Sequence, residues 1–491
     1  MEKIPPLISQ KNSGLRTETA FFCKDLAADI IILSSQVEMN GGTDMKFLAA
    51  QLPEKISYFE SIGDYDGALK EIEIQLDDYL PSIMIERLRW ERERIVRLKN
   101  NYPYSASEAL GILSRDLEGF TEGEFDSLNS ARKLDSMIFD GEEKFEKRFD
   151  KNLLFTMPEY EKRLKNKNTD REATRVSLHK EIDRLISERQ PARFRVVAKS
   201  LISVEGSDES VYRCWLPVSR VGDQVSSTRI LSSSHSYFLS PADYSQRTVY
   251  MEAAAKNDTV FSIEYEYEIS EISTSLDPFS CVEPDAKKFS GYLCEQAPHV
   301  VFSPLVRSLA EEIAGSENNP YFIAKSFYDW ICENVKYTFM SEYALYPNLS
   351  EFAAVNLRGD CGVKALLFIT LCRIKGIPAR WQSGWFAAPL GASPHDWAMF
   401  WVEPFGWLPV DCSFGGSRKD MPAYREFYFG NLDAFRMVSN SAFMSPLVPA
   451  KRFYRSDPYD NQVGEIETES RNLRSNEWEY SLEISSFERI L

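Results

Sequence analysis

Residues 358–380 read RGDCGVKALLFITLCRIKGIPAR, and this stretch decides the fold. Its middle, Val363 to Ile374, is apolar on nearly every side, which is typical of a helix that is buried all round. Asp360 is a good N-cap residue, so we expect the helix to begin at Cys361. The Gly-Ile-Pro at 376–378 ends it, because glycine and proline terminate helices.

The position of Cys361 has chemical consequences. Backbone N–H groups at the start of a helix are unpaired and the helix dipole is positive there, which favours thiolate over thiol. The same N–H groups could receive an oxyanion. Taken alone, such a cysteine is more often a buried structural thiol, as we expect for Cys372 further along the same helix, and only the surrounding motifs favour Cys361 as a nucleophile.

A β-hairpin is expected further along, where residues 394–411 read PHDWAMFWVEPFGWLPVD. Two apolar runs flank a Pro-Phe-Gly turn. Folding them about Glu403 places Asp411 across from His395, whereas folding about Phe405 places Asp411 across from Met399. The pattern therefore permits a His–Asp pair without choosing the register.

These residues supply the parts of a thiol-based catalytic triad, which needs a base within reach of the nucleophile and a third group to orient the base. His395 is the only histidine after Cys361. Asp411 competes with Asp396 and Asp360 as the orienting acid, although Asp360 is explained as a helix cap.

Other groups near these motifs leave more than one interpretation open. The tryptophans of this stretch either pack or line an acyl-binding cleft: Trp381, Trp385, Trp397, Trp401 and Trp407. An oxyanion donor besides the Cys361 backbone is not identified by the sequence, and Tyr337 or Trp385 are the candidates.

Four regions are predicted along the chain of 491 residues. Residues 1–190 read as helical, with a charged exposed stretch near the end. Residues 191–275 contain short β-branched and aromatic runs and predict a β-sandwich-like domain. Residues 300–455 are mixed and hold the motifs above, and residues 456–491 are taken as a C-terminal tail.

Composition excludes several classes of protein. The formal net charge of -17 opposes binding to nucleic acid or to anionic membranes. The 8 cysteines and 4 histidines are scattered, so we expect no disulfide framework, no metal site and no cofactor. No signal peptide or transmembrane segment is recognised, so a cytoplasmic location is expected.

The order Gly-Asp-Cys, Gly-Ile-Pro-Ala-Arg at 376–380, His395 and Gly-Trp-x-Pro-Val-Asp ending at Asp411 resembles the catalytic core of the transglutaminase-like superfamily. The resemblance covers about residues 321–416. The run at 327–337 is similar to the helix that precedes the nucleophile in bacterial members, and the β region is similar to the strand-rich domain that many of them carry. Cys412 departs from the small residue or proline that often follows the acid.

The resemblance implies an α+β fold: a papain-like core, with the cysteine-bearing helix on an antiparallel sheet, preceded by an all-β domain and a helical N-terminal region. It also implies a Cys361-His395-Asp411 triad that performs acyl transfer on a peptide or protein substrate through an acyl-enzyme. Hydrolysis is slightly favoured, because nothing resembles an amine-recognition or calcium-binding insert. Transamidation with a primary amine is the alternative, and a catalytically inactive binding or scaffold protein is another. The oligomeric state is not indicated.

Overall fold

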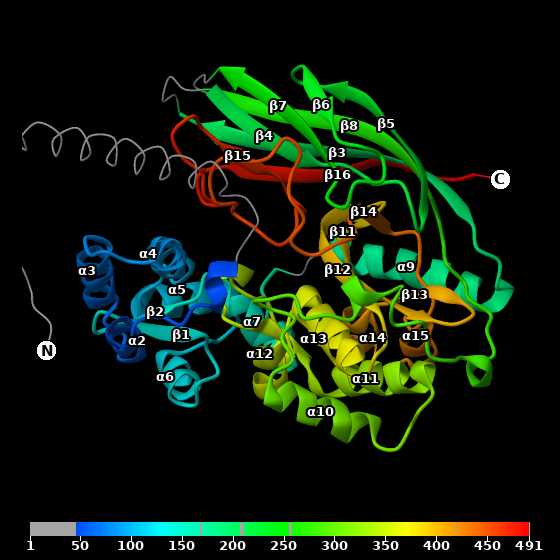
Figure 1. The fold of residues 1–491 in the computed structure, drawn as a ribbon, viewed down its shortest axis with the longest axis horizontal. Helices are drawn as coiled ribbons and strands as arrows, with labels where there is room; N and C mark the ends of the chain where they lie inside the picture. Colours follow the sequence, from blue (N-terminus) through cyan, green and yellow to red (C-terminus); the bar gives the residue numbers. More distant parts are fainter. Residues whose placement is uncertain (1–45, 167–168, 207–210, 255–257, 419, 491) are drawn as a thin grey trace, which may run out of the picture.

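The architecture comes from a computed structural model. It describes residues 46–166, 169–206, 211–254, 258–418 and 420–490. The helices of residues 54–130 gather at one side, a β layer lies on top, and a mixed core with its own helices lies below it (Figure 1). The fold is therefore α+β, as expected from the sequence, and its four-stranded sheets are antiparallel.

The N-terminal part is helical, with one small hairpin. The capping box at Ser105 and Glu108 shows why a helix begins there, because each side chain satisfies a free backbone N–H of the other residue. The elements are η1 (Lys46–Ala49), α2 (Glu54–Ser61), α3 (Tyr65–Leu76), α4 (Ser82–Asn101), α5 (Ala106–Asp116), α6 (Glu122–Ser130), β1 (Ser136–Phe139), β2 (Glu142–Phe145), α7 (Phe149–Thr156), α8 (Pro158–Glu161) and α9 (Thr169–Glu188).

The β layer consists of two four-stranded sheets, in the orders β15-β4-β7-β6 and β16-β3-β8-β5. Buried and partly exposed side chains alternate along β3, because one of its faces packs inside the layer. The strands that follow the helical part are β3 (Arg193–Glu205), β4 (Val211–Pro217), β5 (Val225–Ser233), β6 (Tyr237–Leu239), β7 (Thr248–Ala254) and β8 (Asp258–Ser270).

The C-terminal residues complete both sheets. β15 (Glu465–Glu467) pairs with β4, and β16 (Glu479–Ile490) pairs with β3 along its whole length. The sequence predicted a C-terminal tail at 456–491, but the two strands of this segment belong to the two sheets of the β layer. The pairing escaped sequence analysis because β16 has no fully buried residue and joins a partner far away in the chain.

The core is built around α13 (Cys361–Ile374), which begins and ends where the sequence predicts. It packs on the sheet β13-β12-β11-β14. The remaining elements are η2 (Pro278–Ser280), η3 (Ser290–Tyr292), α10 (Pro304–Ala314), α11 (Pro320–Asn334), β9 (Lys336–Tyr337), η4 (Tyr343–Leu345), α12 (Leu349–Asn356), β10 (Arg358–Gly359), β11 (Ala379–Ala388), β12 (Gly391–Val402), β13 (Gly406–Val410), α14 (Cys412–Gly416), α15 (Pro422–Phe427) and β14 (Arg436–Asn440).

The N-terminal helices are fastened to the core beside the start of α13. Asn152 on α7 donates to the Phe339 carbonyl at 3.1 Å and accepts from the Phe339 N–H at 2.7 Å. Arg358, two residues before the N-cap, forms an ion pair with Asp135 at 2.6 Å. The helical part therefore supports the segment that carries Cys361.

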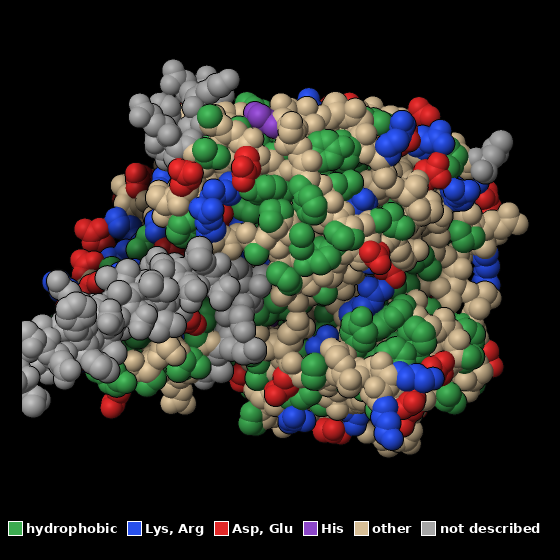
Figure 2. Space-filling view, turned by 45° about the horizontal axis from the view of Figure 1, so that its top comes forward, with side chains coloured by type: hydrophobic (Ala, Val, Ile, Leu, Met, Phe, Trp, Pro, Cys, Tyr) green, Lys and Arg blue, Asp and Glu red, His purple; other side chains and the backbone are tan. Residues whose placement is uncertain are grey.

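The surface is mixed in character. Apolar side chains gather over the β-rich part of the face in Figure 2, whereas basic and acidic side chains alternate along its lower rim. Within the described part of the chain, every helix is too short or too polar to span a bilayer.

Candidate active site

The hairpin of β12 and β13 places His395 and Asp411 on one face of the sheet. Trp401 pairs with Trp407, and Val402 pairs with Gly406, so the hairpin folds about Pro404. This register lies between the two that the sequence allowed. The last pair joins Ala398 to Val410, so the next position along the hairpin places Asp411 beside Trp397. Trp397 and His395 share a face of β12, because side chains alternate along a strand.

His395 and Asp411 are joined by a buried hydrogen bond. His395 Nε2 lies 2.7 Å from Asp411 Oδ2. The other oxygen of Asp411 accepts from the N–H groups of Ser413 and Phe414, at 3.0 Å and 2.8 Å, because Asp411 is also the N-cap of α14. With Nε2 as the donor to an ionised carboxylate, Nδ1 is the free acceptor of the ring.

Arg436 on β14 stabilises the ionised carboxylate of Asp411. Its Nη2 lies 3.1 Å from Asp411 Oδ2, and its Nη1 lies 3.1 Å from Asp433 Oδ1. Burial opposes ionisation of Asp411, but His395 and Arg436 outweigh it and lower the pKa of that carboxyl. Sequence analysis missed Arg436, because it stands outside the motifs and meets Asp411 only through pairing of β14 with β11.

Cys361 occupies the first position of α13, as predicted. Asp360 caps the helix by accepting from the Val363 N–H at 3.1 Å. The Asp360 carboxyl also accepts from the Tyr343 hydroxyl at 2.6 Å. Cys361 is 9% exposed, and the cysteine further along the helix, Cys372, is fully buried in the core as expected.

The hydrogen-bond partner of the thiol is Asp396 and not His395. Cys361 Sγ donates to Asp396 Oδ2 at 3.3 Å. The structure thus forms two pairs, Cys361 with Asp396 and His395 with Asp411, and adjacent residues of β12 supply one member of each. No hydrogen bond joins Cys361 to His395 among the described residues.

The contact with Asp396 changes the expected charge of the thiol. Burial and the nearby Asp396 and Asp360 carboxyls raise the pKa of Cys361 well above its usual range. The expectation that the helix start yields a thiolate is therefore wrong for this resting arrangement. Burial and the neighbouring Asp460 and Asp360 also raise the pKa of Asp396 above the usual range of a carboxyl.

Gln462 ties the two adjacent residues of β12 together. Its side-chain Nε2 donates to the His395 carbonyl at 3.0 Å and to Asp396 Oδ1 at 2.7 Å. The backbone carbonyl of Gln462 accepts a hydrogen bond from Trp385 Nε1 at 2.6 Å. Trp385 is therefore not free to donate to an oxyanion, and that candidate is wrong.

Tyr337 remains a candidate oxyanion donor. It lies on β9, which pairs with β10 directly before the N-cap of α13. Burial, with the nearby Cys361, Asp360 and Asp396, raises the pKa of Tyr337, so its hydroxyl keeps its proton and can donate. The tryptophans at 381, 385 and 397 are buried and pack in the core.

Comparison with known proteins finds a family model that matches the part of the chain that holds this site. Residues 307–412 match the model of the transglutaminase-like superfamily. An uncharacterized protein of Haemophilus influenzae is 24% identical over 185 residues, 31% of this chain and 50% of that protein, so the chain spans about half the length of this relative. Similar solved structures include a "Putative Cysteine Protease from Cytophaga hutchinsonii", 17% identical over 62% of this chain and 92% of that chain, with a TM-score of 0.41. Another is the periplasmic domain of TgpA from Pseudomonas aeruginosa, which is 16% identical over 50% of this chain and 95% of that chain, with a TM-score of 0.26.

Proposed function

We propose that this chain, whose residues 307–412 belong to the transglutaminase-like superfamily, is a cysteine-dependent acyl-transfer enzyme acting on a peptide or carboxamide. Cys361 is the nucleophile, His395 the base and Asp411 the acid that orients it. The observation that carries the proposal is the buried His395–Asp411 pair, because His395 lies on β12 directly before Asp396, which contacts Cys361.

The chemistry follows from the protonation of each group. His395 Nδ1 takes the thiol proton, and the Cys361 sulfur attacks the carbonyl carbon. The Cys361 N–H at the helix start stabilises the oxyanion, with Tyr337 as the candidate side-chain donor. Collapse expels an amine, which receives the proton from His395, and leaves a thioester. His395 then takes a proton from water, whose oxygen attacks the thioester carbonyl, and the same proton returns to the sulfur as the carboxylic acid product leaves.

The resting site is not yet arranged for this reaction. The thiol is bound to Asp396, and its raised pKa keeps it protonated. Substrate binding must therefore turn the sulfur from Asp396 toward His395 before attack. This requirement suits an enzyme whose nucleophile stays protected until a substrate displaces the contact.

Hydrolysis is the preferred outcome, and transamidation is the alternative. Both begin with the same acyl-enzyme and differ in whether water or a primary amine attacks it. The preference for hydrolysis rests on the lack of any recognisable amine-binding insert in the sequence.

A substrate screen tests the proposal and the choice of acceptor. Peptides with and without glutamine are incubated with the full chain, in the presence and absence of a fluorescent primary amine. We expect release of ammonia or cleaved peptide, no turnover by Cys361→Ala, and retained turnover by the matched variant Cys372→Ala. Incorporation of the amine would identify transamidation. Turnover by Cys361→Ala would refute the nucleophile, and a folded, inert wild type would favour a binding role.

A further inference from the structure

A small cavity of about 100 Å³ lies on the side of α13 away from Cys361. It is lined by α13, β11, the segment 291–300 and the segment 441–443. At about 10–15 Å³ per water molecule, it has room for several waters or for one small organic molecule. The exposed Tyr292 at its edge gives access from solvent.

The cavity holds a buried cation without a counter-ion. Arg373 is 6% exposed and has no carboxylate within ion-pair distance among the residues that the structure describes. Its Nε donates to the Ala379 carbonyl at 3.0 Å, and its Nη1 donates to the Cys294 carbonyl at 2.8 Å. The second terminal nitrogen, Nη2, makes no hydrogen bond to any described residue.

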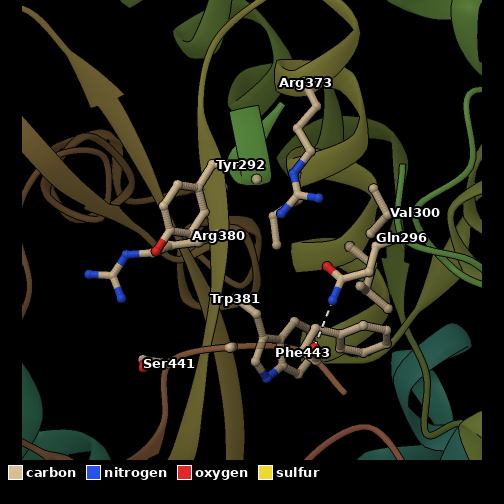
Figure 3. Close-up of a pocket in the computed structure, with 12 residues that line it drawn as sticks. Tyr292, Gln296, Val300, Arg373, Arg380, Trp381, Ser441 and Phe443 are labelled. Carbon is tan, nitrogen blue, oxygen red and sulfur yellow. Dashed lines mark hydrogen bonds between the residues drawn. The ribbon is translucent and has the colours of Figure 1, made fainter. Parts of the chain in front are cut away.

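Figure 3 shows the guanidinium of Arg373 reaching into the space between Tyr292, Gln296 and Trp381. Two carbonyl groups compensate its charge only in part, and burial lowers the pKa of Arg373 to about 10. A guanidinium with this pKa is still charged near neutral pH. Burying a charge without a partner is costly, so a bound anion would relieve the cost.

The surroundings add further positive charge in a chain that is acidic overall. Arg380 and Arg220 share the carboxylate of Asp223, at 2.5 Å and 3.3 Å. The guanidinium of Arg380 lies on the other side of Tyr292 from Arg373 in Figure 3. Two arginines thus share one aspartate beside Arg373, which has no carboxylate of its own among the described residues, although the formal net charge of the whole chain is -17.

Most of the other lining residues are apolar or aromatic, among them Val300, Leu366, Ile369, Trp381 and Phe443. The polar ones are Gln296, Ser441 and Arg380, and Arg380 is already paired with Asp223. Apolar walls with one convergent charged group are typical of sites that bind a small ionised organic molecule. A fully hydrated inorganic anion would leave these walls without contact.

We propose that this cavity binds a small organic carboxylate, with the carboxylate on Arg373 Nη2 and an apolar or aromatic body against Trp381 and Phe443. The site is separate from the acyl-transfer site and does not depend on the function proposed for Cys361.

Titration calorimetry with the full-length chain tests the site with benzoate, benzamide and inorganic phosphate at constant chloride concentration. We expect benzoate to bind, and benzamide, which has the same shape without the charge, to bind at least tenfold more weakly. Phosphate binding without benzoate binding would overturn the organic carboxylate, and binding of neither would overturn the site.

Two variants locate the binding. Arg373→Met should weaken benzoate binding at least tenfold, whereas Lys375→Met, at the same end of α13 but paired with Glu311 on the surface, should leave it unchanged. Arg373→Lys keeps a charge and should bind more tightly than Arg373→Met. Undiminished binding by Arg373→Met would contradict the proposal. If that variant does not fold, the ratio of benzoate to benzamide affinity in the wild type decides.

Discussion

Burial and the Asp396 carboxyl, whose Oδ2 lies 3.3 Å from the sulfur, together set the resting charge of Cys361. A helix start by itself would favour the thiolate. Burial and the carboxyls around the sulfur outweigh that effect and raise the pKa of the thiol. Residue type and helix position alone therefore did not predict the protonation state of the Cys361 thiol, because it also depends on burial and on a carboxyl from β12.

Replacing Asp396 by Asn should activate the thiol. The variant removes the carboxyl and leaves an amide that can donate to the sulfur, so the pKa of Cys361 should fall. Iodoacetamide labelling of Cys361, followed by mass spectrometry from pH 5 to 11, measures this. Below the thiol pKa, labelling should quicken roughly tenfold for each unit by which the pKa falls.

The control for this measurement is Asp457→Asn. Asp457 is a partly buried carboxyl whose charge acts on Asp396, and no hydrogen bond joins it to Cys361 among the described residues. Its effect on labelling should be much smaller. An Asp396→Asn profile that overlies the wild type would show that this carboxyl does not control the thiol.

His395 and Asp411 should differ in how much activity each variant retains. His395→Ala removes the base and should lower kcat/KM by about 10²–10⁴-fold. Asp411→Asn keeps the ring, but its amide can face Nε2 as a donor and favour the tautomer with the proton on Nδ1. Steady-state assays should therefore rank wild type above Asp411→Asn and Asp411→Asn above His395→Ala. Unchanged kinetics for Asp411→Asn would exclude Asp411 as the orienting acid.

At the scale of elements, the close approach of α13 to its neighbours depends on Gly362. A Cβ at this position would lie 2.1 Å from the Tyr343 hydroxyl and 2.8 Å from Asp396 Oδ2. Both groups belong to contacts that hold the start of the helix. Only glycine leaves room for them.

Gly362→Ala should displace these contacts. We expect a loss of about 1–3 kcal/mol in the free energy of unfolding, which is typical of overpacking a core, together with altered labelling of Cys361. Gly111→Ala in α5, where a Cβ meets nothing within 4 Å, is the matched helical control. It should be neutral or stabilising by about 0.5–1 kcal/mol. Urea unfolding checks both, and equal stability of the two variants would contradict the packing.

Elements that depend on local sequence signals were predictable, whereas features that depend on contacts between distant segments were not. The bounds of α13 and the existence of the hairpin were predictable, because N-cap, apolar run and turn residues are local signals. The register of the hairpin was not predictable, because the apolar pattern is equally consistent with turns centred on Glu403, Pro404 or Phe405. The structure centres the turn on Pro404. Arg436 and Gln462 were not predictable either, since each reaches the site through contacts between distant segments.

At the scale of the whole molecule, three carboxyls lie close enough to one another to interact: Asp396, Asp457 and Asp460. Burial and mutual repulsion raise the pKa values of Asp396, Asp457 and Asp460. For an acid whose pKa is higher in the folded than in the unfolded chain, stability falls as pH rises from the unfolded value through the folded value. Each unit of raised pKa costs about 1.4 kcal/mol above that window.

Asp457→Asn should therefore stabilise the protein at alkaline pH. Asn resembles the protonated acid, so the melting temperature should exceed that of the wild type at pH 8.5, and the difference should shrink toward pH 4. Asp243→Asn, at an exposed position, should change little at either pH. A constant difference across the range would show that the Asp457 carboxyl does not titrate as the structure implies.

The measurement that tests the central claim most directly is detection of the acyl-enzyme on Cys361. The full chain is mixed with an activated ester of a short acyl-peptide, quenched in acid and analysed by intact and peptide mass spectrometry. The account predicts one acyl group on the peptide containing Cys361, accumulating transiently in the wild type and absent from Cys361→Ala. In His395→Ala, where deacylation lacks its base, the adduct should persist longer. Acylation at another residue, or equal labelling of wild type and Cys361→Ala, would contradict the account.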